Sequence, residues 1–216
     1  YVGHMNKTEK IAVLDYRMSN MFSIKNALSI LGFDAIVTSD YETILSCDGA
    51  ILPGVGAFPE AMKNINELNL DSSIKDFIST GRPFVGICLG FQLLFDQSDE
   101  IEDTLGLGII SGEVKDFSKL NDKIRVPHVG WNKVNNYKKN NSRNKNPLKI
   151  IKDEDYFYFV HSNYVQPSDD SYINTITNYA GIDFCSSIIK DNIFACQFHP
   201  EKSGQRGIQV LKNIYK

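Results

Sequence analysis

The residues best suited to chemistry are Cys88 and the pair His199 and Glu201, which lie far apart in the sequence. A thiol becomes a strong nucleophile when a base removes its proton, and an imidazole oriented by a carboxylate is such a base. Pro200 stiffens the backbone between the imidazole and the carboxylate. These three side chains suffice for acyl transfer, with Cys88 as nucleophile, His199 as base and then acid, and Glu201 as the group that orients His199.

Cys88 stands at the centre of Gly86-Ile87-Cys88-Leu89-Gly90, which follows an apolar run and precedes helical spacing over residues 91–95. A strand, a tight turn and a helix in this order form a nucleophile elbow, in which the backbone of the nucleophile is strained. Side chains at both glycines would collide with neighbouring elements, and the positive end of the helix favours a thiolate. The alternative is an inert cysteine buried at a strand end.

The elements that must position these residues alternate between strands and helices in the first half of the chain. Alternation of this kind predicts a parallel α/β sheet with ligands at the carboxyl ends of its strands. Residues 105–117 are expected to form strands of an antiparallel layer, and residues 156–198 form further strands before a closing helix. The expected strands of the first half are 10–16, 34–39, 49–54 and 82–85, and the expected helices are 21–31, 60–68 and 72–79.

A glycine-rich turn, Pro53-Gly54-Val55-Gly56-Ala57-Phe58, ends the third expected strand and lacks the lysine of a phosphate loop. Its two glycines allow backbone N–H groups to approach a ligand closely, as an oxyanion hole requires. The alternative is an ordinary turn. A separate pattern, Cys196-x-x-His199, resembles half of a metal site, but no second ligand pair has zinc spacing, so neither a metal nor a cofactor is expected.

Composition places the chain among soluble globular proteins, with 216 residues, a net charge of −3 and 42% hydrophobic residues. It gives no indication of a nucleic-acid or membrane partner, and it contains no membrane-spanning stretch or secretory signal. The four cysteines lack close pairing, which predicts reduced thiols and a cytoplasmic location. Residues 1–4 precede Met5 and are interpreted as an expression remnant, so a single domain is expected over 5–216.

Two stretches, Gly86-Ile87-Cys88-Leu89-Gly90 and Gln197-Phe198-His199-Pro200-Glu201, together resemble the signature of the class I (triad) glutamine amidotransferases. The resemblance runs from Ile11 to the end of the chain. It implies a three-layer α/β sandwich, with a central, mostly parallel sheet flanked by helices and a smaller antiparallel layer. Three further stretches narrow it to the glutaminase subunits of imidazole glycerol phosphate synthase in histidine biosynthesis: Pro127-His128-Val129-Gly130-Trp131-Asn132, Tyr158-Phe159-Val160-His161-Ser162 and His199-Pro200-Glu201-Lys202-Ser203.

The resemblance implies an enzyme that hydrolyses glutamine to glutamate and ammonia through a cysteine thioester. The ammonia would pass to a separate (β/α)8 barrel cyclase subunit, which makes imidazole glycerol phosphate and an aminoimidazole carboxamide ribotide, within a heterodimer. Three alternatives remain open: a paralogous glutaminase subunit that feeds a sugar-modifying amidotransferase, a non-catalytic assembly subunit, and a cysteine peptidase. The last suits the expected pocket residues least, because they fit a small amino-acid substrate.

By position, the resemblance makes Cys88, His199 and Glu201 the catalytic triad. The backbone N–H of Leu89 would form the oxyanion hole with a second N–H from the glycine-rich turn, donated by Val55 or Gly56. Rotation of one peptide group in this turn would move that N–H into or out of the hole. We therefore expect the turn to act as a switch that the partner subunit controls.

The resemblance also assigns a glutamine pocket and a partner-facing segment. Gln92 and Glu100 would line the pocket, with Glu100 facing the α-ammonium group of the substrate. Backbone around Ser162 and Asn163 would hold its α-carboxylate, and Asn163 replaces an aromatic residue that is usual in the family. His128 and His161 are expected to be hydrogen-bonded at the partner-facing surface and not catalytic. The residues expected to face the partner are Pro127, His128, Trp131, Asn132 and Lys202.

Overall fold

The computed structural model describes residues 8–18, 20–120, 123–137, 146–149, 152 and 155–216. The predicted remnant at residues 1–4 and the predicted domain start at Met5 lie outside this part, and both stay predictions. The strands of the structure form two sheets. A two-stranded sheet comprises β8 (His128–Lys133) and β10 (Tyr156–His161). The strands of the large sheet are β1 (Lys10–Leu14), β2 (Asp34–Thr38), β3 (Gly49–Leu52), β4 (Phe84–Ile87), β5 (Phe95–Ser98), β6 (Thr104–Leu105), β7 (Ile110–Asp116), β9 (Asn135–Asn136), β11 (Asn163–Pro167), β12 (Ile173–Tyr179), β13 (Ile182–Lys190) and β14 (Ile193–Cys196).

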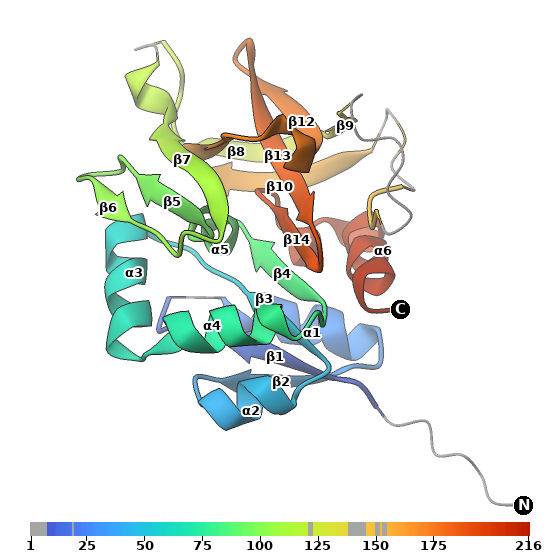
Figure 1. Ribbon diagram of the computed structural model, residues 1–216. Coiled ribbons are helices and arrows are strands. Elements are labelled where there is room, and N and C mark those ends of the chain that lie inside the picture. Colours follow the sequence, from blue (N-terminus) through green and yellow to red (C-terminus); the bar gives the residue numbers. More distant parts are fainter. Residues whose placement is uncertain (1–7, 19, 121–122, 138–145, 150–151, 153–154) are drawn as a thin grey trace, which may run out of the picture.

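The large sheet has a parallel half and a mainly antiparallel half (Figure 1). Its strand order is β2-β1-β3-β4-β14-β13-β11-β7-β5-β6, with β12 attached to β13 and β9 to β12. Pairing is parallel from β2 through β1, β3 and β4 to β14, which confirms the α/β class predicted from alternating strands and helices. β7, expected in a separate antiparallel layer, instead joins this sheet, antiparallel to β11 and parallel to β5.

Helices cover both faces of the parallel half of the sheet. Since successive strand residues point to opposite sides of a sheet, each strand contributes side chains to the cores on both faces. On β1, Ala12 and Leu14 enter the core beneath α2, α3 and α4, whereas Ile11 and Val13 enter the core beneath α1 and α6. No helix of the described residues has the length and hydrophobicity of a membrane span. The helices are α1 (Met21–Ile30), α2 (Tyr41–Ser46), α3 (Phe58–Glu67), α4 (Leu70–Ser79), α5 (Leu89–Gln92) and α6 (Gly204–Tyr215), with short 3-10 turns η1 (Phe117–Lys119), η3 (Asp170–Tyr172) and η4 (Pro200–Lys202).

The helix predicted over residues 91–95 is wrong in its extent. The helix after Cys88 is the single turn α5, and the chain enters β5 at Phe95. Leu93, Leu94 and Phe95 are completely buried, so no polar face marks where the helix ends. A short run that is apolar on all sides fits a buried strand as well as a buried helix.

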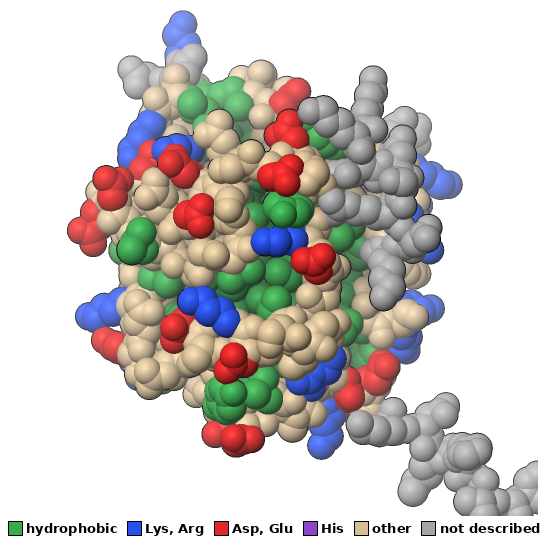
Figure 2. All heavy atoms as spheres, in the orientation of Figure 1, with side chains coloured by type: hydrophobic (Ala, Val, Ile, Leu, Met, Phe, Trp, Pro, Cys, Tyr) green, Lys and Arg blue, Asp and Glu red, His purple; other side chains and the backbone are tan. Residues whose placement is uncertain are grey.

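The β8–β10 sheet lies against the end of the large sheet where His199 follows β14, and hydrogen bonds from backbone N–H groups hold it there. The backbone N–H of His199 donates to the carbonyl of Tyr158 on β10 at 2.9 Å, and the Tyr158 N–H donates to Ser203 Oγ at 3.0 Å. This pair is the smaller antiparallel layer that the family resemblance predicts. On the face seen in Figure 2, acidic and basic side chains are interspersed.

Candidate active site

Two neighbouring strands deliver the cysteine and the histidine to the same edge of the sheet. β4 and β14 pair in parallel, with Ile87 opposite Cys196, and the N–H of Cys88 donates to the carbonyl of Cys196 at 2.9 Å. Cys88 directly follows β4, and His199 follows β14 after a short extension. Because both strands point the same way, their carboxyl ends meet where an α/β sheet binds its ligands.

The turn at Cys88 has the strained geometry of a nucleophile elbow. Cys88 has a φ of 53°, in a region that residues with a Cβ adopt at a cost of about 1–3 kcal/mol. A Cβ at Gly90 would lie 1.8 Å from the carbonyl oxygen of Leu52, and one at Gly86 would lie 3.1 Å from Phe91 Cα. The glycines on both sides of the cysteine therefore allow β3, β4 and α5 to pack closely around it.

His199 and Glu201 form a buried ion pair. His199 Nδ1 lies 2.8 Å from Glu201 Oε1, and each side chain is 3% exposed. Since a carboxylate only accepts, Nδ1 carries a hydrogen and Nε2 remains for proton exchange. Burial alone lowers the pKa of His199, but the negative charges of Cys88 and Glu201 outweigh burial and raise it to about 10. Among the described residues His199 Nε2 has no hydrogen-bond partner, so it is available to a substrate or to the thiol.

The Cys88 sulfur contacts two groups that the sequence did not indicate. Cys88 is 5% exposed, and its Sγ lies 3.6 Å from the carbonyl oxygen of Val160 on β10. The side-chain amide of Gln197 donates from Nε2 to the same sulfur at 3.6 Å. Gln197 stands in the stretch Gln197-Phe198-His199-Pro200-Glu201 that carries the family resemblance, but no role was expected for its side chain.

The glycine-rich turn is held in one conformation by two hydrogen bonds. Tyr16 donates from its hydroxyl to the Pro53 carbonyl at 2.6 Å, and burial together with Cys88 raises the pKa of Tyr16, so this hydroxyl keeps its proton. A Cβ at Gly54 would lie 1.9 Å from that hydroxyl oxygen. The N–H of Val55 donates to the Met18 carbonyl at 3.1 Å. In this conformation the Val55 N–H is therefore engaged elsewhere and does not serve an oxyanion hole.

Of the residues expected to line a glutamine pocket, Gln92 lies beside the strand ends that carry Cys88 and His199, because it contacts Gln197. Gln92 is 4% exposed, and its Nε2 donates to the backbone carbonyl of Asn163 at 3.1 Å. Glu100 accepts from the N–H of Phe58, the first residue of α3, at 2.6 Å. The carbonyl of Ser162 accepts from Phe117 N–H, and the buried Asn163 Oδ1 has no partner among the described residues.

A second buried polar cluster joins β8 to β10. His128 Nδ1 lies 2.9 Å from His161 Nε2, His161 Nδ1 lies 2.7 Å from the Asn163 carbonyl, and Asn132 Nδ2 lies 3.2 Å from His128 Nε2. Because a carbonyl only accepts, His161 Nδ1 carries a hydrogen. His161 Nε2 then accepts from His128 Nδ1, and His128 Nε2 accepts from Asn132. Burial lowers the pKa of His128 to about 4 and that of His161 to about 3, so both rings are neutral.

The structure differs from the sequence prediction for the side chain of His128, which is 4% exposed and stacks on Tyr179 with ring centroids 4.0 Å apart. Strand residues alternate between faces, so His128 points inward and Val129 and Trp131 point outward. Trp131 is 55% exposed and Pro127 is exposed, whereas Lys202 is half-buried. Asn132 also points inward, and its Nδ2 donates to the Asn178 carbonyl.

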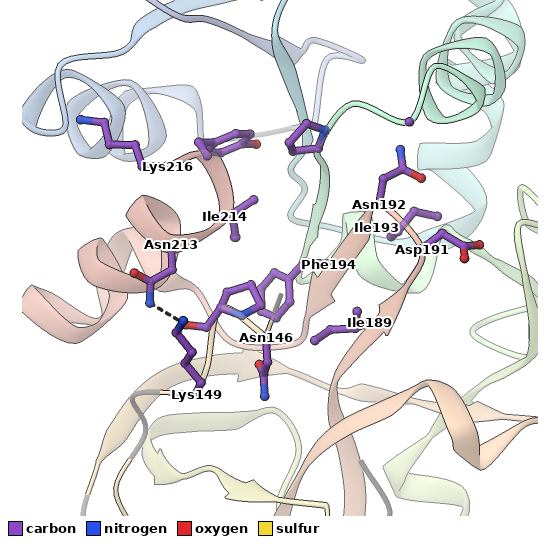
Figure 3. A pocket seen from close by; sticks show the side chains of 14 residues that line it. Asn146, Lys149, Ile189, Asp191, Asn192, Ile193, Phe194, Asn213, Ile214 and Lys216 are labelled. Carbon is purple, nitrogen blue, oxygen red and sulfur yellow. Dashed lines mark hydrogen bonds between the residues drawn. The ribbon is translucent and has the colours of Figure 1, made fainter. Parts of the chain in front are cut away.

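A cavity of about 770 Å³ lies at the opposite end of the same strands (Figure 3). Pro83 and Ile193, at the amino ends of β4 and β14, line it together with the end of α6. Its amide side chains already have partners: Asn213 donates to the Pro147 carbonyl, and Asn192 donates to two backbone carbonyls. Asn146, the third amide, accepts through Oδ1 from Leu148 N–H. The cavity therefore lies away from Cys88, and each of the three amide side chains that line it among the described residues already has a partner.

The Cys196 thiol is engaged within the core. It is completely buried and donates to the Phe198 carbonyl at 3.3 Å, and burial raises its pKa. No group of three or more His, Cys, Asp and Glu side chains in the described ranges is arranged to hold a metal ion.

Comparison with known proteins identifies the family to which this chain belongs. The family model described as glutamine amidotransferase class-I matches residues 12–216. A chain in the structure of PurLQS from Thermotoga maritima superposes with a TM-score of 0.71 and 20% identity, covering 96% of this chain and 97% of that one. This chain therefore belongs to the class I glutamine amidotransferase family.

Within that family the chain is similar to proteins named imidazole glycerol phosphate synthase subunit HisH. The one from Caldanaerobacter subterraneus subsp. tengcongensis is 46% identical over 204 residues, which are 94% of this chain and 96% of the relative. The one from Aquifex aeolicus is 46% identical over 206 residues, which are 95% of each chain. The similarity extends over nearly the whole length of both relatives.

Proposed function

We propose that this chain hydrolyses glutamine to glutamate and ammonia as the glutaminase subunit of an imidazole glycerol phosphate synthase. The observation that carries the proposal is the buried ion pair of His199 and Glu201 beside a strained cysteine on an elbow. Similarity to HisH subunits supports the choice of this reaction among those that such a cysteine and histidine perform.

The proposed reaction proceeds in two acyl-transfer steps. His199 Nε2 takes the proton of Cys88, and the sulfur attacks the carboxamide carbon of glutamine. The tetrahedral intermediate collapses when the C–N bond breaks and His199 returns the proton to the leaving nitrogen, which departs as ammonia. Water then attacks the thioester with His199 as its base, the C–S bond breaks, and glutamate leaves. Glu201 holds the imidazole in one tautomer and stabilises its charged form.

The oxyanion of the intermediate needs backbone donors. The N–H of Leu89 lies at the start of α5, where the first N–H groups of a helix have no partner within it. The second proposed donor comes from Val55 or Gly56. Because Val55 N–H donates to Met18, its use requires rotation of a peptide group in the turn. Glu100 is proposed to bind the α-ammonium group of glutamine, with Gln92 and the backbone near Ser162 and Asn163 completing the pocket.

The proposed partner is a (β/α)8 barrel cyclase subunit, in a cytoplasmic heterodimer. It would dock on the outer face of the β8–β10 sheet, where Trp131 is exposed beside Pro127, with Lys202 nearby in sequence to His199. This face lies directly over the catalytic residues, since β10 supplies the carbonyls that contact His199 N–H and Cys88. The short separation would let ammonia pass to the cyclase without release into water.

The test is to replace the nucleophile in the complex with the cyclase subunit. Cys88→Ala is expected to reduce glutamine-dependent formation of imidazole glycerol phosphate by about 10⁶-fold, the scale seen when a triad nucleophile is removed. Ammonium salts should still support the reaction, because the cyclase holds the acceptor site. Cys196→Ala is the matched control and should keep glutamine-dependent activity. Near-normal use of glutamine by Cys88→Ala would disprove the role of Cys88, and failure of the wild-type complex to form this product would favour another acceptor.

A further inference from the structure

The side chain of Gln197 is a buried polar group that the mechanism above does not use. It directly follows β14 and is 0% exposed. Its Nε2 lies 3.6 Å from Cys88 Sγ, and its Oε1 lies 3.0 Å from Gln92 Nε2. Burial of an amide is costly unless its donors and acceptors are satisfied. Both ends of this amide have partners, and one of them is the reacting sulfur.

The orientation of the Gln197 amide follows from a series of contacts that runs from the Asn163 carbonyl through Gln92 to Gln197. The carbonyl oxygen of Asn163 only accepts, so the Gln92 atom that lies 3.1 Å from it is Nε2. The same nitrogen donates its second hydrogen toward Gln197, and the Gln197 atom facing it is therefore Oε1. This leaves the Gln197 N–H group directed at the sulfur. Nitrogen and oxygen in both amides are thus assigned by a group that cannot rotate.

The two polar contacts of the sulfur favour opposite protonation states. The Val160 carbonyl accepts a hydrogen bond from the thiol, so it favours the protonated form. The Gln197 N–H donates, and a donor interacts more strongly with a negative acceptor than with a neutral one. When the proton moves from Cys88 to His199, the contact with Val160 loses its hydrogen and the contact with Gln197 strengthens.

We propose that Gln197 is the side-chain donor that stabilises the Cys88 thiolate, and that Gln92 and the Asn163 carbonyl hold its N–H group on the sulfur. This inference rests on the proposed role of Cys88 as nucleophile. It adds a fourth side chain to the three of the triad, and it gives Gln92 a task besides lining the substrate pocket. His199 accepts the proton, while Gln197 stabilises the charge that the proton leaves behind.

The first test measures the alkylation of Cys88 by iodoacetamide as a function of pH, with the modified cysteine located by mass spectrometry. Gln197→Met keeps the length of the side chain and removes the donor. Its alkylation midpoint is expected to lie about one pH unit higher than in the wild type, which slows alkylation about tenfold below both midpoints. Gln166→Met, at an exposed position on β11, is the matched control and should keep the wild-type midpoint.

The second measurement uses the unmodified chain and does not depend on how the variant folds. The NMR signals of the Gln197 side-chain N–H group should shift with pH at the midpoint that alkylation gives for Cys88, and Cys88→Ser should abolish that shift. An unchanged midpoint in folded Gln197→Met, or Gln197 signals that ignore the titration of Cys88, would overturn the inference. Neither readout needs glutamine turnover, so both outcomes are distinct from failure of the proposed glutaminase reaction.

Discussion

Two histidine sites at the same end of the sheet are buried to a similar degree but differ in charge, because the fold favours the charged form of His199 and the neutral forms of His128 and His161. His199 is 2% exposed and its pKa is raised to about 10, whereas His128 and His161 are 4% and 6% exposed and their pKa values are lowered to about 4 and 3. Burial disfavours the charged form of all three. The difference comes from the partners, because His199 faces a carboxylate and a thiol, and the other two face each other, a carbonyl and an amide.

This difference separates a reactive histidine from a structural one. A neutral imidazole in a closed chain of hydrogen bonds has no free nitrogen, since each ring nitrogen of His128 and His161 already has a partner. His199 keeps Nε2 without a partner among the described residues and has an ion pair that stabilises its charged form. Proton transfer needs both properties, and of these two sites the one at the end of β14 combines them.

Among changes that test this difference, the largest expected effect comes from making the reactive site resemble the structural one. Glu201→Gln replaces the carboxylate by a neutral amide, so the pKa of His199 should fall toward its ordinary value. We expect the rate of glutamate release to fall about 10⁴-fold, the scale seen when the third member of a triad is neutralised. This loss is smaller than that of Cys88→Ala, because the nucleophile and its base remain.

Glu113→Gln is the matched control, since Glu113 pairs with Lys115 at the surface and should not affect the rate. Histidine ¹⁵N NMR of Glu201→Gln reports the protonation of His199 directly. A Glu201→Gln enzyme as inactive as Cys88→Ala would assign the carboxylate a direct chemical role beyond orientation and charge.

An intermediate effect is expected from the glycine-rich turn, which lies beside the reactive site without being part of its ion pair. Losing one oxyanion donor costs about 10²–10³ in rate, and Val55 N–H donates to Met18 in this structure. The isolated chain should therefore release glutamate about 10²–10³ times more slowly than the complex with the cyclase subunit and its acceptor ligand. The reason is that binding favours the rotated peptide group.

The measurement compares glutamate release by the chain alone, by the complex, and by the complex with acceptor ligand. The complex carrying Cys88→Ala gives the background rate for each condition. Equal turnover in all three states would leave residues 53–56 as an ordinary turn and would remove the proposed switch.

The sequence was sufficient for those parts of the site that local patterns encode. The two glycines around Cys88 and the short spacing from His199 to Glu201 are readable because each depends on neighbouring residues in the chain. The parallel order of β1, β2, β3 and β4 also follows from the alternation of elements in the first half of the chain. The roles of these residues stay predictions, although the structure brings them together at one edge of the sheet.

Features that depend on distant contacts were not predictable from local patterns. Gln197 contacts Cys88 only because β14 lies beside β4, and its amide is oriented by Gln92 on α5. The inward direction of His128 depends on which face of β8 packs against Phe159 and Tyr179. The sequence of β8 does not show which of its alternating residues face the core. The end of α5 was missed because the residues after it are buried on every side.

The smallest expected effect concerns the stability that the neutral histidines provide. Between about pH 4 and pH 6.5 the unfolded chain protonates His128 and the folded chain does not. The free energy of unfolding should therefore rise with pH in this window, by up to about 1.4 kcal/mol per pH unit from this residue. His128→Gln removes that contribution, so its unfolding free energy should depend less steeply on pH. Urea denaturation followed by Trp131 fluorescence measures the pH dependence of the unfolding free energy in both proteins.

Asn132→Ala is the control, because it removes a hydrogen bond to His128 but keeps the titrating ring. It should lower the free energy of unfolding while retaining its steep dependence on pH. Identical slopes in His128→Gln and the wild type would show that His128 is not held neutral by the fold.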